Sequence, residues 1–183
     1  MSILSQGGTV TAGAGAGALR FSEAQFAQRE RDAERELKSL RPALDLTSVF
    51  LEIGAGDCAL SRRVAGYVER VYALDISDDL MGRLGGPPNL VRMMHDGVRI
   101  PLPEAEVDVA FSRSLTISQL PGICHALKDG GVYLTASKGP AAELREVFFD
   151  AGFSRIRFYV GGLRVPYLLA RVLDDTFRIE AVK

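Results

Sequence analysis

The segment that most constrains the fold of this chain is an apolar run that ends in an acidic residue and a turn with two glycines. Residues 49–58 read VFLEIGAGDC, in which the β-prone start runs up to Glu52 and is followed by Gly54 and Gly56. Residues 57–68 then have the apolar spacing of a helix, so the pattern predicts a strand, a tight turn and a helix. Glycines in such a turn allow torsions that a Cβ would penalise, and they let a ligand approach the main chain. The segment is therefore typical of a turn that binds a nucleotide-like cofactor.

Two further acidic residues follow apolar runs in the same way. Residues 70–75 end in Asp75, which lies about twenty residues past the glycines, where dinucleotide-binding folds place a carboxylate on a ribose diol. Asp96 and Gly97 come after a third apolar segment. Because ligands of such folds bind outside the carboxyl ends of parallel strands, we expect Glu52, Asp75 and Asp96 to surround one ligand.

The glycine spacing by itself fits two classes of cofactor. Gly54, Gly56 and Ala59 satisfy the glycine-rich fingerprint of NAD-binding proteins, which permits alanine at the third place. Glu52 separates the two classes, because an NAD site normally keeps that position apolar. An NAD-dependent oxidoreductase is thus the least favoured reading, and the sequence shows no Tyr-Lys or Cys-His catalytic pairing for it.

Residues 51–57, LEIGAGD, resemble motif I of the class I S-adenosylmethionine-dependent methyltransferases, and the chain is similar to their type 11 group. In that family the acidic residue lies beside the amino-acid end of the cofactor, and Cys58 stands where a third glycine is usual. The resemblance extends over about residues 46–160 and is more specific than any single motif. It includes, in the family's order, residues 71–77, 96–97, 100–103, 107–112, 127–134 and 152–159.

The resemblance implies a Rossmann-like, doubly wound α/β fold with helices on both faces of the sheet. The sheet is expected to have seven mostly parallel strands, with an antiparallel last strand inserted between strands five and six. The implied cofactor is S-adenosylmethionine, with Glu52, Gly54 and Gly56 on its amino-acid part, Asp75 on the ribose and Asp96 on the adenine. The full set of expected cofactor-binding residues is Glu52, Gly54, Ala55, Gly56, Asp75, Ile76, Asp96, Gly97 and Ser112.

No catalytic residue can be assigned with the same directness, because methyl transfer from a sulfonium mainly requires alignment of the acceptor. His95 is a weak candidate for a base near neutral pH, and Arg113 is a weak candidate for binding an acidic acceptor. No Asn-Pro-Pro-Tyr type motif follows the fourth strand, which argues against methylation of amino groups on bases or glutamine. We therefore expect methylation of a small molecule at oxygen.

A competing interpretation is a degenerate S-adenosylmethionine-binding or interaction module without transferase activity. Relatives often carry Glu-His residues after the fourth strand and a longer insertion after the fifth. This chain has only residues 115–120 and 138–140 at those places. The acceptor pocket is therefore expected to be open, completed by a partner chain, or absent.

Composition limits the other classes of function. The 183 residues correspond to one domain. Lysine plus arginine number 22 against 23 aspartate plus glutamate, so no net positive field favours a nucleic-acid partner. The sequence predicts no membrane span and no metal site, and the only cysteines, Cys58 and Cys124, fit a reducing, cytoplasmic setting. Cys58 is expected to be a packed small residue, although a helix start would lower its pKa and leave reactivity open.

The expected organisation has three parts. Residues 1–19 form a disordered Gly/Ala-rich tail, residues 20–42 a leading helix, and residues 43–183 the cofactor-binding domain. The leading helix either covers the cofactor, with Phe21, Phe26 or Arg29 in contact with it, or is a solvated helix pinned by a few apolar residues.

The end of the chain has two expected elements. Residues 165–173 are expected to form a short amphipathic helix that packs on the core, and residues 177–182 the last strand. A homodimer or a membrane-surface contact through that helix is the open alternative.

Overall fold

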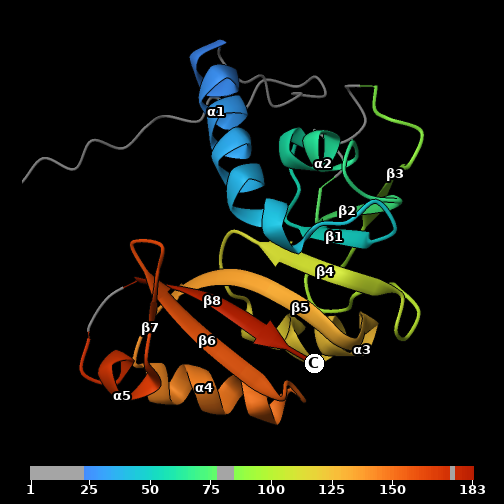
Figure 1. Ribbon diagram of the computed structural model, residues 1–183. Helices are drawn as coiled ribbons and strands as arrows, with labels where there is room; N and C mark the ends of the chain where they lie inside the picture. The colour runs from blue at the N-terminus through green and yellow to red at the C-terminus, as the bar shows by residue number, and fades with distance from the viewer. Residues whose placement is uncertain (1–22, 78–84, 174–175) are drawn as a thin grey trace, which may run out of the picture.

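The computed structural model describes residues 23–77, 85–173 and 176–183 and contains a single sheet in the order β3-β2-β1-β4-β5-β8-β6-β7 (Figure 1). β3, β2, β1, β4 and β5 pair in parallel, whereas β8 is antiparallel to both β5 and β6. The strands are β1 (Val49–Ile53), β2 (Arg70–Asp75), β3 (Leu90–Met94), β4 (Val107–Ser112), β5 (Leu127–Lys138), β6 (Arg155–Val160), β7 (Leu163–Val165) and β8 (Thr176–Val182).

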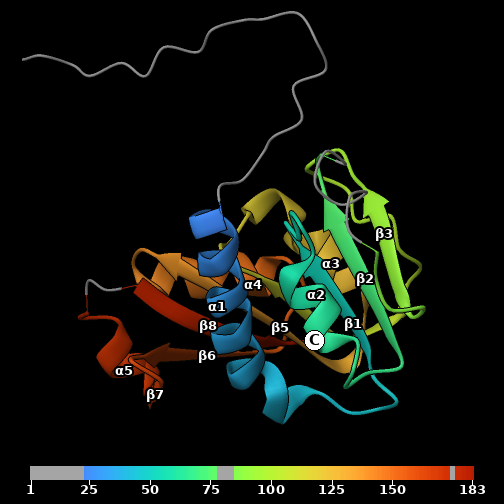
Figure 2. The ribbon, with the colours of Figure 1, turned by 90° about the horizontal axis from the view of Figure 1, so that it is seen from above.

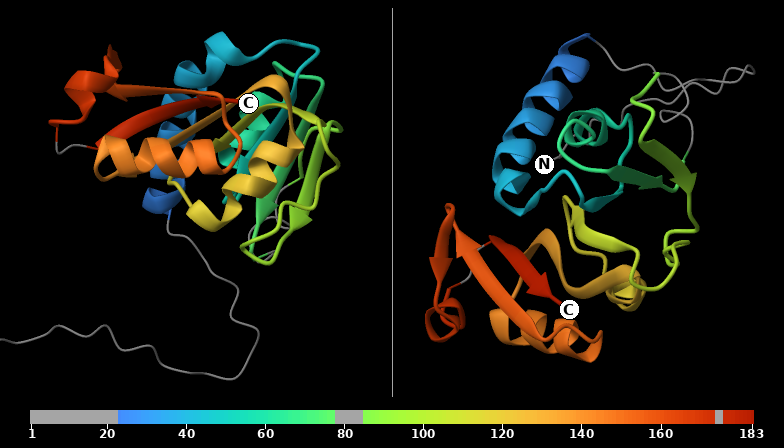
Figure 3. Two further views of the ribbon diagram at one scale, coloured as in Figure 1. Left: turned by 90° about the horizontal axis from the view of Figure 1, so that it is seen from below. Right: turned by 45° about the vertical axis from the view of Figure 1, so that its right-hand side comes forward.

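Helices cover both faces of the sheet. In Figures 1 and 2, α1 and α2 lie on one face, and the other views show α3 and α4 on the opposite face (Figure 3). The helical segments are α1 (Glu23–Leu40), η1 (Arg41–Ala43), α2 (Ala59–Val64), η2 (Ile117–Gln119), α3 (Leu120–Ala126), α4 (Ala141–Asp150) and α5 (Tyr167–Ala170). The predicted doubly wound fold with an antiparallel last strand between the fifth and sixth is confirmed.

The sheet has eight strands among the described residues, one more than the seven expected. The additional strand, β7, pairs antiparallel with β6 across a turn in which Gly161 and Gly162 both have positive φ. The helix expected over residues 165–173 is consequently shorter and occupies only α5, which begins after Pro166. The predicted extent of that helix was wrong because its first residue belongs to the edge strand.

Alternation along β1 divides the core into two layers. All five residues of β1 are buried, as expected for a parallel strand covered on both faces. Phe50 packs with Leu40 and Leu60 on the face of α1 and α2, and Leu51 packs with Ile123 on the face of α3 and α4. The strand that carries Glu52 is therefore fixed from both sides.

The leading helix is packed onto the domain. α1 occupies most of the segment expected at 20–42, and its Ala33 and Leu40 are fully buried. The predicted tail at residues 1–19 and Phe21 lie outside the described residues. No helix in the described part of the chain is long and apolar enough to cross a membrane.

Candidate functional site

The glycine turn after β1 is held against the end of β2. The main-chain N–H groups of Gly54 and Ala55 donate to Leu74 O at 2.8 and 2.9 Å, and Gly56 N–H donates to Asp75 Oδ2 at 2.7 Å. Gly54 and Gly56 have φ values of +74° and +55°, which favour glycine. A Cβ at Gly56 would also displace the guanidinium of Arg29 from α1.

A cavity of about 260 Å³ lies at the carboxyl ends of β1, β2 and β4. It brings together four of the predicted cofactor-binding residues and both catalytic candidates, together with polar residues of the segment after β4. Its lining residues are Ile53, Gly54, Asp75, Ile76, His95, Ser112, Arg113, Ser114, Thr116 and Gln119. Two adjacent strand ends, β1 and β2, therefore contribute a glycine turn and a carboxylate to one cavity.

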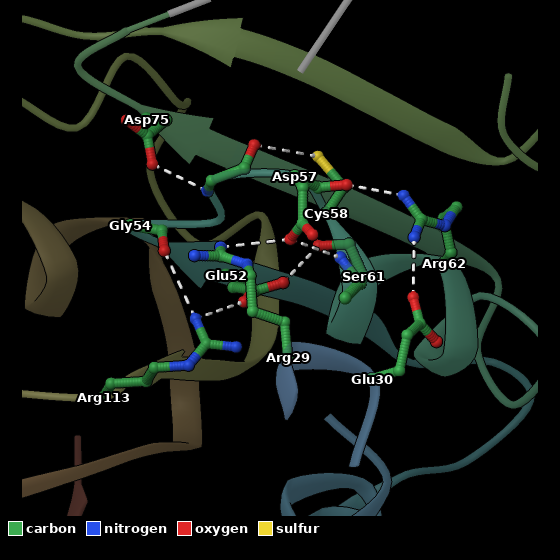
Figure 4. A network of polar contacts seen from close by, with 12 residues as sticks. Arg29, Glu30, Glu52, Gly54, Asp57, Cys58, Ser61, Arg62, Asp75 and Arg113 are labelled. Carbon is green, nitrogen blue, oxygen red and sulfur yellow. Dashed lines mark hydrogen bonds and ion pairs between the residues drawn. The ribbon is translucent and has the colours of Figure 1, made fainter. Parts of the chain in front are cut away.

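Glu52 does not line this cavity. Its side chain is fully buried, accepts a hydrogen bond from Ser61 Oγ at 2.5 Å and pairs with Arg113 Nη1 at 3.1 Å (Figure 4). Burial raises the pKa of Glu52 to about 7, against the lowering effect of Arg113. The contacts of the Glu52 carboxylate are therefore with side chains of the protein itself.

The side chain of Arg113 connects three parts of the fold. Its guanidinium also donates to Gly54 O at 3.3 Å and pairs with Glu36 Oε2 of α1 at 2.8 Å. These contacts connect α1, β1 and the glycine turn through one side chain. The contacts of Arg113 with Glu52 and Gly54 are drawn in Figure 4. An acidic acceptor would have to compete with Glu36 and Glu52 for this guanidinium.

Ion pairs fix α1 beside the glycine turn. Arg29 pairs with the buried Asp57 at 3.1 Å, and Glu30 pairs with Arg62 at 3.2 Å and with Arg63. Sequence reasoning considered Arg29 but missed Asp57 and Glu36. The signal for Glu36 was the spacing on α1, where Arg29, Ala33, Glu36 and Leu40 recur at the intervals of one helical face.

Cys58 is a packed residue with an unreactive thiol. It is fully buried and adopts a left-handed conformation, with φ of 59°, just before α2. Burial raises the pKa of the Cys58 thiol to about 11, and the nearby Glu52 acts in the same direction. The expectation that the helix start lowers this pKa was wrong, because removal from water outweighs it.

The hydroxyl of Ser112 is already fully hydrogen-bonded. Ser112 Oγ donates to Ser114 O at 2.8 Å, since a carbonyl only accepts. The hydroxyls of Tyr133 and Thr135, at 2.6 and 2.9 Å, must then be the donors to Ser112 Oγ. Burial raises the pKa of Tyr133, which keeps its proton in place. Any contact of Ser112 with a ligand would have to come from its main chain.

His95 lines the cavity but one of its nitrogens is occupied. Its Nδ1 accepts a hydrogen bond from Gly97 N–H at 3.1 Å, so the neutral ring carries its proton on Nε2. Proton abstraction by Nδ1 would require that bond to break. The imidazole is therefore better suited to donate a hydrogen bond than to act as a base.

Asp96 organises the loop that follows β3. It is exposed and does not line the cavity, and its Oδ1 accepts hydrogen bonds from Val98 N–H at 2.9 Å and Arg99 N–H at 2.7 Å. These backbone hydrogen bonds lower the pKa of Asp96. Gly97 O accepts a hydrogen bond from Gln119 at 2.9 Å, which joins this loop to the segment after β4.

Comparison with known proteins gives a family-model match over part of the chain and a shared fold. Residues 51–134 match the family model described as "Methyltransferase domain". A SAM-dependent methyltransferase from Aquifex aeolicus superposes with a TM-score of 0.61 at 18% identity, covering 88% of this chain and 98% of that one. Phosphoethanolamine N-methyltransferase 2 from Haemonchus contortus, in complex with S-adenosyl-L-methionine, gives a TM-score of 0.62 at 16% identity, covering 84% and 52%. A SAM-dependent methyltransferase from Mesorhizobium loti gives 0.61 at 14% identity, covering 81% and 97%.

At these identities the solved structures establish the fold alone. Comparison with curated proteins found no match. The predicted family resemblance is confirmed by the matched segment, which contains the glycine turn, Asp75 and Ser112.

Proposed function

We propose that this chain is a class I S-adenosylmethionine-dependent methyltransferase whose cavity binds S-adenosylmethionine for methyl transfer to a small molecule at oxygen. The match of residues 51–134 to a methyltransferase family model and the fold support this proposal. When bound, the cofactor supplies a methyl group on a sulfonium sulfur. The chain's own residues bind and orient this group and hold the acceptor in line with it.

The observation that carries this proposal is the position of Asp75. Its carboxylate lines the cavity beside Gly54 while accepting hydrogen bonds from Gly56 N–H at 2.7 Å and Ser77 N–H at 3.1 Å. A carboxylate offers about four lone-pair sites, so about two remain for the hydroxyls of a ribose diol. The same hydrogen bonds fix the carboxylate relative to the glycine turn, which is what a bound nucleoside requires.

Oxygen is proposed as the acceptor atom because the segment after β4 lacks the Asn-Pro-Pro-Tyr type motif. Ser114, Thr116 and Gln119 surround the cavity there with neutral polar groups. We expect the chain to bring a hydroxyl of the acceptor into this polar end and to shield the reacting atoms from water.

The rival proposal, a cofactor-binding module without transferase activity, has its own support. The connection from β5 to α4 consists only of Gly139 and Pro140, and the guanidinium of Arg113 is held by Glu36 and Glu52. The cavity volume is also slightly below the roughly 300–1,000 Å³ of typical ligand pockets.

The test is calorimetric titration of the full chain with S-adenosylmethionine, S-adenosylhomocysteine and NAD. Asp75→Ala should weaken binding of the first two by about 100-fold or more, since each hydrogen bond to a charged group contributes about 1.5–3 kcal/mol. Asp129→Ala, at an exposed aspartate of β5, is the matched control and should leave affinity unchanged.

Retained affinity in Asp75→Ala would overturn the ribose assignment, and binding of NAD alone would move the chain to the oxidoreductases. A screen of hydroxylated acceptors with methyl-labelled cofactor then separates the transferase from the binding module. Label incorporated at oxygen supports the proposal, whereas cofactor binding without transfer to any acceptor supports the module.

A further inference from the structure

A second cavity, of about 410 Å³, lies between the end of α1 and the half of the sheet formed by β5, β8 and β6. Its volume is within the roughly 300–1,000 Å³ of typical ligand pockets. Among the described residues, none lines both this cavity and the cavity at the carboxyl ends of β1, β2 and β4. The cavity is therefore a separate place at which the chain can hold a small molecule.

Apolar side chains form a large part of its wall. Val132 and Leu134 contribute from β5, where residues two apart lie on one face of the sheet. Pro42 and Ala43 contribute from η1. Leu134 is buried and Val132 is half-buried, and both belong to the apolar cluster on the α1 face of the sheet. A ligand with an apolar body would gain free energy by covering this wall.

Two charged side chains of β8, Glu180 and Arg178, also line the cavity, and the charge of Glu180 is balanced inside the protein. Glu180 pairs with Arg157 of β6 and accepts a hydrogen bond from the hydroxyl of Tyr159 at 2.9 Å. Burial and the hydrogen bond to Glu180 raise the pKa of Tyr159, so the phenol stays neutral. Glu180 therefore adds no uncompensated negative charge to the cavity.

Arg178 has no such partner. Its Nη2 donates to the main-chain oxygen of Ser39 at 3.0 Å, and within the part of the chain that the structure describes it forms no ion pair. A guanidinium has five N–H donors in a planar fork, so most of those of Arg178 can serve a ligand. The side chain is half-buried. The cavity thus has one uncompensated positive charge beside its apolar wall.

These features together select one class of ligand. A carboxylate matches the guanidinium fork with two parallel hydrogen bonds, and an apolar body attached to it would cover the wall. An organic cation would be repelled by Arg178. A nucleic-acid strand presents many phosphates, whereas the cavity offers one unpaired cation close to Glu180. A small monoanion with an apolar body fits better than either.

We propose that this cavity binds a small carboxylate with an apolar body, in which Arg178 pairs with the carboxylate and the body packs on Val132, Leu134 and Ala43. The site goes beyond the proposed methyl transfer and is independent of it, because it uses other residues than the cofactor cavity.

The experiment compares 2-naphthoate with 2-naphthalenemethanol, which has the same ring system but no charge. Affinities are measured by calorimetry for the full chain and for Arg178→Met, Arg178→Lys and Ala43→Leu. Arg155→Met is the matched control, at an exposed arginine of β6 that does not line the cavity. The titrations of the wild-type chain are repeated with S-adenosylhomocysteine present in excess.

The wild-type chain should bind 2-naphthoate about 10- to 100-fold more tightly than the alcohol, which corresponds to one charge-assisted hydrogen bond. Arg178→Met should remove this preference and Arg178→Lys should keep part of it, while both change the affinity for the alcohol by less than about twofold. Ala43→Leu should weaken both ligands, because the larger side chain fills the cavity. Arg155→Met and S-adenosylhomocysteine should leave both affinities unchanged.

Three results would overturn the inference. The first is a wild-type chain that does not bind 2-naphthoate more tightly than the alcohol. The second is an unchanged preference in Arg178→Met. The third is competition between 2-naphthoate and S-adenosylhomocysteine, which would place the naphthoate in the cofactor cavity. Circular dichroism melts verify that each variant is folded; if Arg178→Met is not, Arg178→Lys and the two ligands on the wild-type chain still decide the question.

Discussion

Glu52 should make the stability of this chain fall as pH rises, which is opposite to the effect of an ordinary ion-paired carboxylate. Burial raises the pKa of Glu52 from its usual 4.5 to about 7, and Arg113 and Ser61 offset only part of that. Between these pH values the unfolded chain has released the proton while the folded chain keeps it, so the free energy of unfolding decreases with pH. Below this window both states are protonated and the residue contributes no penalty.

The size of this loss of stability follows from the difference between the usual pKa of Glu52 and its pKa in the folded chain. From 4.5 to about 7, at about 1.4 kcal/mol per pH unit, the ionisation of Glu52 costs about 3 kcal/mol of stability once the pH exceeds the folded pKa. Glu52→Gln keeps the shape of the side chain and removes its titration. The variant should therefore gain about 3 kcal/mol relative to the wild-type chain between about pH 4.5 and about pH 8.

Urea unfolding followed by far-ultraviolet circular dichroism measures this difference, since the chain has no tryptophan. Glu34→Gln is the control, because Glu34 is exposed, and its hydrogen bond and ion pair with Lys38 lower its pKa. A flat difference between wild type and Glu52→Gln would refute the burial argument. A wild-type chain that gains stability relative to the variant as pH rises would show that Arg113 dominates.

Three further predictions concern individual contacts. Tyr133→Phe removes a donor to Ser112 Oγ and should lower the free energy of unfolding by about 1 kcal/mol in urea titrations. Gly56→Ala combines a positive φ with a collision against Arg29, and should destabilise the chain by about 1–2 kcal/mol or more in the same assay. Cys58, with its pKa raised to about 11, should react with iodoacetamide at neutral pH far more slowly in the folded chain than in urea; equal rates would contradict its burial.

Much of the fold was predictable because its signals are local. The apolar runs ending at Glu52 and Asp75 lie in β1 and β2, and the glycines between them make the predicted turn. The sequence did not predict β7 and the short α5, because a three-residue edge strand and a four-residue helix leave little periodicity to detect. The bounds of β7 depend on its pairing with β6, and no local sequence pattern indicates that pairing.

The candidate site, too, was only partly predictable from the sequence. The sequence by itself determined that a glycine turn and Asp75 follow neighbouring strands, since parallel strands bring their carboxyl ends to one edge of a sheet. It could not determine the partner of each charge, because Coulomb attraction and the cost of burial depend on distances across the fold. Only the tertiary structure placed Arg113 on Glu52 and Arg29 on Asp57. Among the described residues it thereby decided that both oxygens of Glu52 are bonded, whereas one buried oxygen of Asp57 has no hydrogen-bond partner.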